Sequence, residues 1–119
     1  MTSKKIRICA FTGTRADYPR IKSVLLNLKK DKTFELKIVV TGSHLLKSAG
    51  STYKEILDDK FKIDHKVKMF DDPPDYSIYG GAKAFARCSS GIADILKNYK
   101  PDIALVTVDR VETLAIASV

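Results

Sequence analysis

Three short stretches of the sequence place polar or charged side chains where a ligand could use them. They are residues 12–17 (TGTRAD), residues 41–44 (TGSH) and residues 108–112 (VDRVE). A glycine lets the backbone come close to a ligand, and the planar guanidinium of an arginine can grip a phosphate with two hydrogen bonds. A carboxylate or an imidazole can take or give a proton. All three stretches are therefore candidates for binding and for acid–base chemistry.

The first stretch, residues 12–17, matches neither of two common nucleotide-binding motifs. It lacks the G-x-G-x-x-G pattern of a dinucleotide-binding turn, and it lacks the second glycine and the Gly-Lys-Ser/Thr ending of a P-loop. It does precede a predicted helix, whose first N–H groups attract anions, so Arg15 is placed to hold a phosphate there. The alternative is that Gly13 serves only the turn and that Arg15 pairs with Asp17. The residues alone leave both interpretations open.

His44 and Asp109 also have structural alternatives. A single histidine is often structural or simply exposed, and His65, the other histidine, is typical of a solvated strand. Asp109 precedes Glu112 by three residues, which is the spacing of a capping box, and a helix cap contributes about 1 kcal/mol. A cap and a functional carboxylate are compatible, so the residues do not separate the two roles.

The hydrophobic pattern predicts strands and helices in alternation. Strands are predicted at residues 5–11, 34–41, 62–69 and 102–108, and helices at residues 18–30, 52–58, 77–99 and from Asp109 onward. This order predicts a Rossmann-like α/β fold, in which a parallel sheet with right-handed crossovers carries helices on both faces. Ligands bind at the carboxyl ends of such strands, the edge at which all three polar stretches should meet.

Local signals refine these elements. Asp17 is expected to cap the helix at 18–30, and Thr52 with Glu55 has the spacing of a capping box for the next helix. The strongly apolar strand at 102–108 is expected to be buried, whereas the polar strand at 62–69 is expected at an edge of the sheet.

The composition fits one globular domain. The chain has 119 residues, of which 45% are hydrophobic and 29% charged, and no apolar run is long enough to span a bilayer. The net charge of +7 comes from basic residues that are interleaved with acids, and no nucleic-acid motif accompanies them, so we expect no nucleic-acid partner and no membrane partner. Cys9 and Cys88 have no metal or disulfide spacing, and a reducing cytoplasm suits them best. We expect no metal and no cofactor.

The last residues, LAIASV, are apolar and carry no glycine, proline or polar cap that would close a helix. We therefore expect residues 1–119 to be a fragment of a longer protein.

Four stretches taken together resemble a known family. The runs TGTRADY, IVVTGSHL, GSTYKEI and KPDIALVTVDRVETLA are similar, in order and spacing, to the hydrolysing UDP-N-acetylglucosamine 2-epimerases of sialic acid and legionaminic acid biosynthesis. Relatives within that family act on UDP-diacetylbacillosamine. The resemblance extends through nearly the whole chain, although residues 70–91 are generic. It implies a GT-B enzyme, in which two Rossmann-like domains face each other across a cleft, and it implies a homodimer. Residues 1–119 would then be the truncated N-terminal Rossmann-like domain, the first half of that architecture, with the second domain absent.

The resemblance also implies a reaction and roles for five residues. UDP is lost by elimination across C1 and C2 of the sugar, and water adds to the resulting 2-acetamidoglucal to give N-acetylmannosamine. Arg15, Ala16 and Arg110 would bind the nucleotide, Asp109 would act as an acid, base or stabiliser of the intermediate, and His44 would line the sugar site as a catalytic residue. One departure stands at Val108, where the family has a glycine before the Asp-Arg pair. The remaining catalytic residues of the family have no counterpart in these 119 residues, so we expect the chain alone to be inactive.

Two other classes of protein compete with this interpretation. A nucleotide-sugar-binding half-domain of a split GT-B glycosyltransferase would need the same fold and the same basic edge. A receiver-type regulatory domain would need an acidic cluster after the first strand, where this chain has TGTRAD with one acid beside an arginine. The first of these is the alternative to the epimerase.

Overall fold

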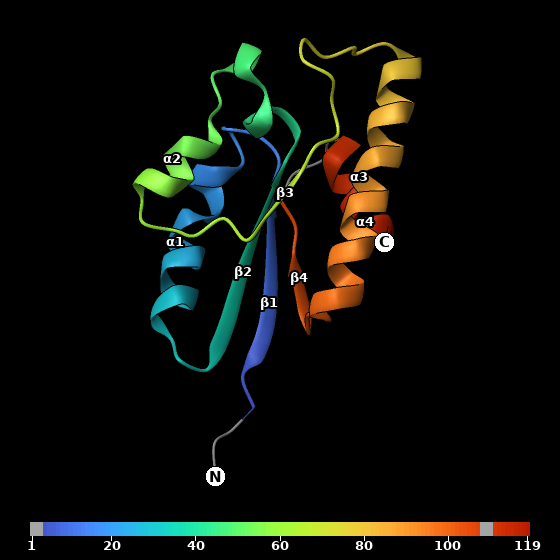
Figure 1. Cartoon of the computed structure of the whole chain (residues 1–119). Coiled ribbons are helices and arrows are strands. Elements are labelled where there is room, and N and C mark those ends of the chain that lie inside the picture. The colour runs from blue at the N-terminus through green and yellow to red at the C-terminus, as the bar shows by residue number, and fades with distance from the viewer. Residues whose placement is uncertain (1–3, 108–110) are drawn as a thin grey trace.

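The protein is a parallel α/β domain, described by a computed structural model for residues 4–107 and 111–119, with the side chains of residues 111–113 excepted. Four strands pair in parallel in the order β3-β2-β1-β4 (Figure 1). They are β1 (Ile6–Thr12), β2 (Phe34–Thr41), β3 (His65–Val67) and β4 (Ile103–Leu105). The helices are α1 (Tyr18–Lys30), α2 (Tyr53–Asp58), α3 (Ile78–Tyr99) and α4 (Val111–Ser118), with two 3₁₀ turns, η1 (Gly42–Leu45) and η2 (Lys47–Ala49).

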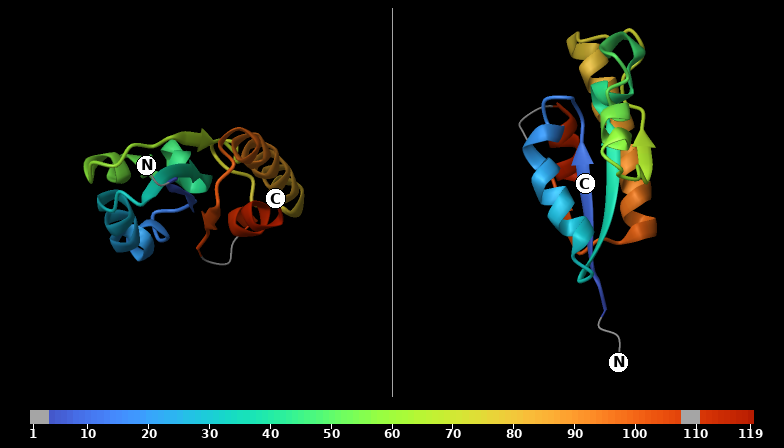
Figure 2. Two further views of the ribbon diagram at one scale, coloured as in Figure 1. Left: turned by 90° about the horizontal axis from the view of Figure 1, so that it is seen from below. Right: turned by 90° about the vertical axis from the view of Figure 1, so that its left-hand side faces the viewer.

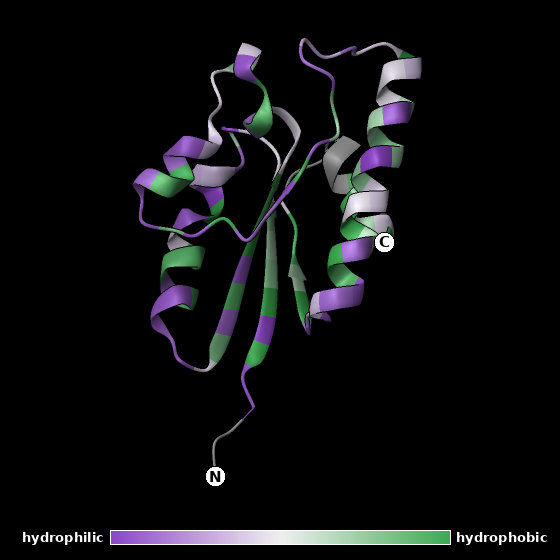
Figure 3. Cartoon of the chain, in the orientation of Figure 1, coloured by the Kyte–Doolittle hydropathy of each residue, from purple (hydrophilic) through white to green (hydrophobic). Residues whose placement is uncertain are grey.

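Helices cover both faces of the sheet, because successive strand residues point to opposite faces. Ala10 of β1 and Ile38 of β2 pack with α1 and α2, whereas Cys9, Phe11 and Val39 pack with α3 and α4 (Figures 1 and 2). β1 and β2 are hydrophobic toward their carboxyl ends and carry hydrophilic bands toward their N-terminal ends (Figure 3). The carboxyl ends of β1 and β2 are thus the buried ends of these strands, and they support the loops that follow.

The predicted alternation of strands and helices and the parallel α/β fold are confirmed, as is the edge position of β3. Two elements are shorter than predicted, because β3 and β4 have three residues each. The prediction that the last strand is buried was wrong: β4 pairs only with β1 among the described residues, and Ile103 is 49% exposed. Its apolar sequence indicated burial, but burial depends on a neighbour on each side of the strand.

The predicted side-chain caps of α1 and α2 are also absent. Asp17 and Thr52 precede these helices, yet both have helical backbone angles and neither side chain accepts a capping hydrogen bond. The predicted start of α3 is sound, since the Ser77 hydroxyl accepts a hydrogen bond from the N–H of Gly80 at 3.1 Å. No helix in the described part of the chain is long and apolar enough to cross a bilayer.

Candidate functional site

The loop after β1 forms a turn that exposes two of the predicted nucleotide-binding residues. Arg15 and Ala16 are exposed, whereas their neighbours Thr14 and Asp17 are buried. One carboxylate oxygen of Asp17 (Oδ2) accepts a hydrogen bond from the N–H of Gly13 at 3.4 Å, which closes the turn from below. The loop therefore presents Arg15 and Ala16 at the carboxyl edge of the sheet, and the hydrogen bond between Asp17 and Gly13 holds the turn in shape.

Arg15 is held by a neighbouring helix. Its Nε lies 3.5 Å from Oε1 of Glu55 in α2, and the Arg15 side chain stays 76% exposed. The predicted alternative, a pairing of Arg15 with Asp17, was wrong, because Asp17 is buried and bonds to Gly13 instead. An ion pair so exposed contributes little to stability, so a ligand phosphate can compete for the guanidinium.

His44 lies inside the same edge. Its ring is fully buried, with Nε2 at 2.9 Å from the hydroxyl of Thr12 and Nδ1 at 2.9 Å from the hydroxyl of Thr52. The backbone N–H of His44 also donates to the carbonyl of Gly13 at 3.3 Å. The loops after β1 and β2 therefore meet as predicted, and His44 joins them beneath the surface.

Burial controls the charge of His44. Loss of water around the ring lowers the pKa of His44 from 6.5 to about 4, and the nearby carboxylate of Asp17 opposes this shift only in part. The imidazole is therefore neutral near pH 7, so one ring nitrogen donates and the other accepts. The predicted place of His44 at the sugar site stays a prediction. In this structure the ring is buried, and both of its nitrogens make hydrogen bonds to threonine hydroxyls.

The sequence missed the roles of Thr52 and Glu55. Their spacing predicted a capping box within α2, but Thr52 bonds to His44 and Glu55 pairs with Arg15. Both residues therefore connect α2 to the site rather than to its own first turn. Only the tertiary fold brings these partners together, so no local signal was available to find them.

Tyr18, the last residue of TGTRADY, anchors the adjoining helices. Its hydroxyl donates to Oδ2 of Asp59 at 2.6 Å, and the Nζ of Lys22 lies 3.1 Å from the same oxygen. Burial of the ring and the hydrogen bond to the Asp59 carboxylate together raise the pKa of the Tyr18 phenol. This contact fixes α1 to the end of α2, on the side of the loop that carries Arg15.

The third polar stretch lies only partly within the described residues. Asp109 and Arg110, together with Val108, lie outside the described residues, so their predicted roles stay predictions. Among the residues that the structure does describe, no group of three or more His, Cys, Asp or Glu side chains could hold a metal ion.

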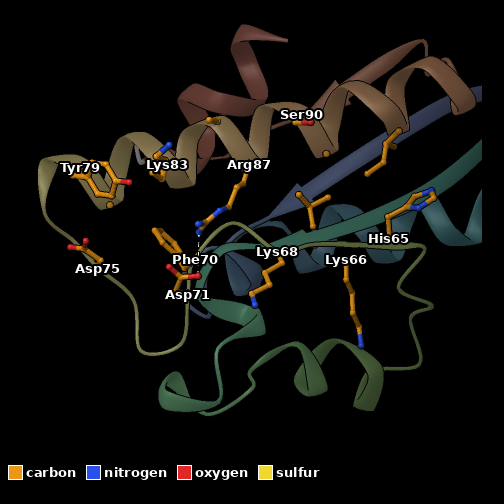
Figure 4. A pocket seen from close by; sticks show the side chains of 15 residues that line it. His65, Lys66, Lys68, Phe70, Asp71, Asp75, Tyr79, Lys83, Arg87 and Ser90 are labelled. Carbon is orange, nitrogen blue, oxygen red and sulfur yellow. Dashed lines mark hydrogen bonds and ion pairs between the residues drawn. The ribbon is translucent and has the colours of Figure 1, made fainter.

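A hollow with a volume of about 1010 Å³ lies elsewhere, between β3 and α3. Its basic side chains do not gather at one point (Figure 4). Arg87 turns from α3 toward Asp71, with its Nη1 3.4 Å from the carboxylate, whereas Lys66 and Lys68 point away from α3. This hollow does not include Arg15, Ala16 or His44, and it is not the predicted nucleotide site.

Comparison with known proteins decides the family. Residues 26–119 match the model of the family described as UDP-N-acetylglucosamine 2-epimerase. The chain belongs to this family. It is 33% identical over 115 residues to a GDP/UDP-N,N'-diacetylbacillosamine 2-epimerase (hydrolyzing) of Campylobacter jejuni, covering 97% of this chain and 29% of that protein. It is 31% identical over 114 residues to a UDP-N-acetylglucosamine 2-epimerase of Neisseria meningitidis, covering 95% of this chain and 29% of that protein.

Solved structures of epimerases share the fold. The chain superimposes with a TM-score of 0.77 and 22% identity on the UDP-GlcNAc 2-epimerase of Neisseria meningitidis bound to UDP-GlcNAc, covering 95% of this chain and 28% of that one. The UDP-GlcNAc 2-epimerase of Methanocaldococcus jannaschii gives a TM-score of 0.73 at 16% identity, with 95% and 28% covered. The 119 residues thus span less than a third of the length of the epimerases they match.

Proposed function

We propose that this chain is the N-terminal domain of a hydrolysing UDP-N-acetylglucosamine 2-epimerase and that its carboxyl edge binds the nucleotide of the substrate. The observation that carries the proposal is the exposed Arg15–Ala16 turn. It is held by the ion pair of Arg15 with Glu55 and by the hydrogen bond from Gly13 to Asp17. Family membership supports a nucleotide-sugar ligand. The printed names of two relatives, from Campylobacter jejuni and Legionella pneumophila, support the hydrolysing reaction.

The proposed reaction has two steps. First, a base removes the proton on C2 while the bond between C1 and the diphosphate oxygen breaks, which releases UDP and leaves a double bond between C1 and C2. Water then adds, with its hydroxyl on C1 and a proton on C2 from the opposite face, which gives N-acetylmannosamine. Arg15 and Arg110 would stabilise the charge that develops on the leaving diphosphate, because charge-assisted donors act most strongly where charge appears.

The five predicted residues are assigned accordingly. Arg15, Ala16 and Arg110 bind the nucleotide. Asp109 acts as an acid, a base or a stabiliser of the intermediate, and His44 is the second catalytic residue. We further propose that the complete enzyme is a homodimer in the cytoplasm that uses no cofactor and has no nucleic-acid or membrane partner. The 119 residues alone are proposed to be inactive, because the family's other catalytic residues would come from the rest of the protein.

UDP binding tests the proposed site. We expect UDP, titrated into the isotope-labelled chain, to shift the amide signals of Gly13 and Ala16, and Arg15→Ala to weaken this binding by about tenfold, the loss of one charge-assisted hydrogen bond. Arg20→Ala is the matched control, because Arg20 lies on an exposed part of α1 beyond the turn. Equal affinity of the two variants would overturn the assignment of Arg15. Release of UDP from UDP-N-acetylglucosamine by the chain alone would overturn its inactivity.

A further inference from the structure

His44 is the centre of a buried bridge between two structural elements. The bridge consists of Thr12, His44 and Thr52, joined by two hydrogen bonds of 2.9 Å each. Thr12 is the last residue of β1, and Thr52 directly precedes α2. The two hydroxyls hold the imidazole from opposite ring nitrogens, so the ring works as a spacer of fixed length between β1 and α2.

Both ends of the bridge are connected to Arg15, which we propose to bind the nucleotide. On one side, Thr12 is followed directly by the turn that carries Arg15. On the other side, Thr52 begins the helix whose Glu55 lies 3.5 Å from the Arg15 guanidinium. The turn that carries Arg15 is therefore connected to α2 twice, through the buried His44 and through the exposed Glu55.

A second set of contacts ties His44 to the turn itself. The carbonyl of Gly13 accepts hydrogen bonds from the N–H of His44 at 3.3 Å and from the hydroxyl of Ser43 at 3.4 Å. Because the His44 side chain is fully buried, a substrate that binds at the surface would not touch the ring. Its influence on a ligand must pass through the backbone and side chains that it holds.

We propose that His44 is a positioning residue, which sets the place of the Arg15 turn relative to α2 through its hydrogen bonds to Thr12 and Thr52 and so controls affinity for the diphosphate. This inference rests on the proposed function of the turn as a nucleotide site. It replaces a direct contact of the imidazole with the sugar by an indirect role. The neutral state of the buried ring suits this role, since one nitrogen donates and the other accepts without a charge to solvate.

Thr52→Val tests the bridge without touching His44. Valine has nearly the shape of threonine but no hydroxyl, so the variant removes one bond of the bridge at a half-buried position. We expect its affinity for UDP to fall by about threefold to tenfold, the effect of one hydrogen bond transmitted to the turn. The matched control is Tyr99→Phe, because the Tyr99 hydroxyl donates to the Glu35 carbonyl at 2.9 Å near the N-terminal end of β2, away from the turn. We expect this control to lose stability and to keep the wild-type affinity for UDP.

A double-mutant cycle separates positioning from contact. In Arg15→Lys the planar fork is gone, so the orientation of the side chain no longer matters in the same way. If the bridge acts through Arg15, the two substitutions are coupled, so adding Thr52→Val to Arg15→Lys changes UDP affinity by less than about twofold, a change within the usual error of additivity. A direct role would instead give the full loss in both backgrounds.

The outcomes are distinct. UDP binding that is weakened by Thr52→Val, unchanged by Tyr99→Phe, and insensitive to Thr52→Val once Arg15 is lysine supports the proposal. Wild-type affinity in Thr52→Val, or an equal loss in both backgrounds, overturns the positioning role and leaves the proposed nucleotide site intact. No shift of any amide by UDP in the wild-type chain overturns the nucleotide site and the positioning role together.

Discussion

Gly91 of α3 packs closely against β3. A Cβ atom built at this position would lie 2.6 Å from Cγ1 and 3.4 Å from Cγ2 of Val67, a buried residue of β3. Valine is branched at Cβ and cannot swing its methyl groups away freely, so the helix would have to move off the strand. Overpacking of this kind costs about 1–3 kcal/mol.

Gly81 of the same helix is the matched control. A Cβ atom there has no neighbour within 4 Å. Both substitutions, Gly91→Ala and Gly81→Ala, gain the same helix propensity, about 1 kcal/mol, so this gain cancels in the comparison. We expect Gly81→Ala to raise the free energy of unfolding slightly and Gly91→Ala to fall below it by about 1–3 kcal/mol.

Urea unfolding of the two variants measures this difference, and Val67→Ala completes the cycle. With both Cγ atoms removed, Gly91→Ala should no longer destabilise the protein. Equal stability of Gly91→Ala and Gly81→Ala would refute the close packing of α3 on β3. So would a Gly91→Ala loss that persists in the Val67→Ala background.

Further predictions concern the buried histidine and the buried thiols. In the folded chain the pKa of His44 is about 4, below its ordinary value of 6.5. Between pH 6.5 and pH 4 the histidine is therefore protonated in the unfolded chain and neutral in the folded chain, which favours unfolding as the pH falls. Urea unfolding should therefore show stability falling by up to about 3 kcal/mol from pH 6.5 to pH 4, with the fall reduced in His44→Gln and kept in His65→Gln; an unchanged fall in His44→Gln would contradict this cause. Cys9 and Cys88 are both buried, and desolvation raises the pKa of Cys9 to about 12, so a thiol reagent at pH 8 should label neither in the folded chain and both in urea, whereas fast labelling of a native thiol would contradict their burial.

Elements that depend on pattern along the chain were predictable from the sequence. The strand period in β1 and β2 and the helical period in α1 follow from side-chain spacing, and parallel pairing follows from alternation of strands with helices. The meeting of the loops after β1 and β2 follows in turn from the topology. These features need no knowledge of distant partners, and the structure contains them.

Features that depend on partners far apart in the sequence were not predictable. Thr52 and Glu55 have the spacing of a capping box, yet a buried histidine and an arginine from other loops compete for them and win. Asp17 departs from the prediction through a local contact, since its carboxylate turns back to the N–H of Gly13, four residues earlier, instead of capping α1. For Thr52 and Glu55 tertiary contacts replace the local ones, because N–H groups at a helix start can be satisfied by water.

These same diverted residues form the proposed site. A side chain that leaves its own helix to bond elsewhere costs that helix a cap, worth about 1 kcal/mol. At this edge the cost falls on α2, the helix that holds Arg15. The two helix starts without a side-chain cap, those of α1 and α2, thus lie beside the turn that we propose to bind the nucleotide.

The most direct test of the account is the reaction of the protein purified from its native gene, after its intact mass has been compared with the 13.2 kDa of these 119 residues. We expect a larger mass and, from UDP-N-acetylglucosamine, equal amounts of free UDP and N-acetylmannosamine; UDP-N,N'-diacetylbacillosamine serves as the second substrate. A sugar epimerised at C2 but still attached to UDP would contradict the hydrolysing reaction. A mass of 13.2 kDa with activity only beside a partner chain would favour the split glycosyltransferase, and no turnover of either sugar nucleotide by a larger protein would contradict the central claim.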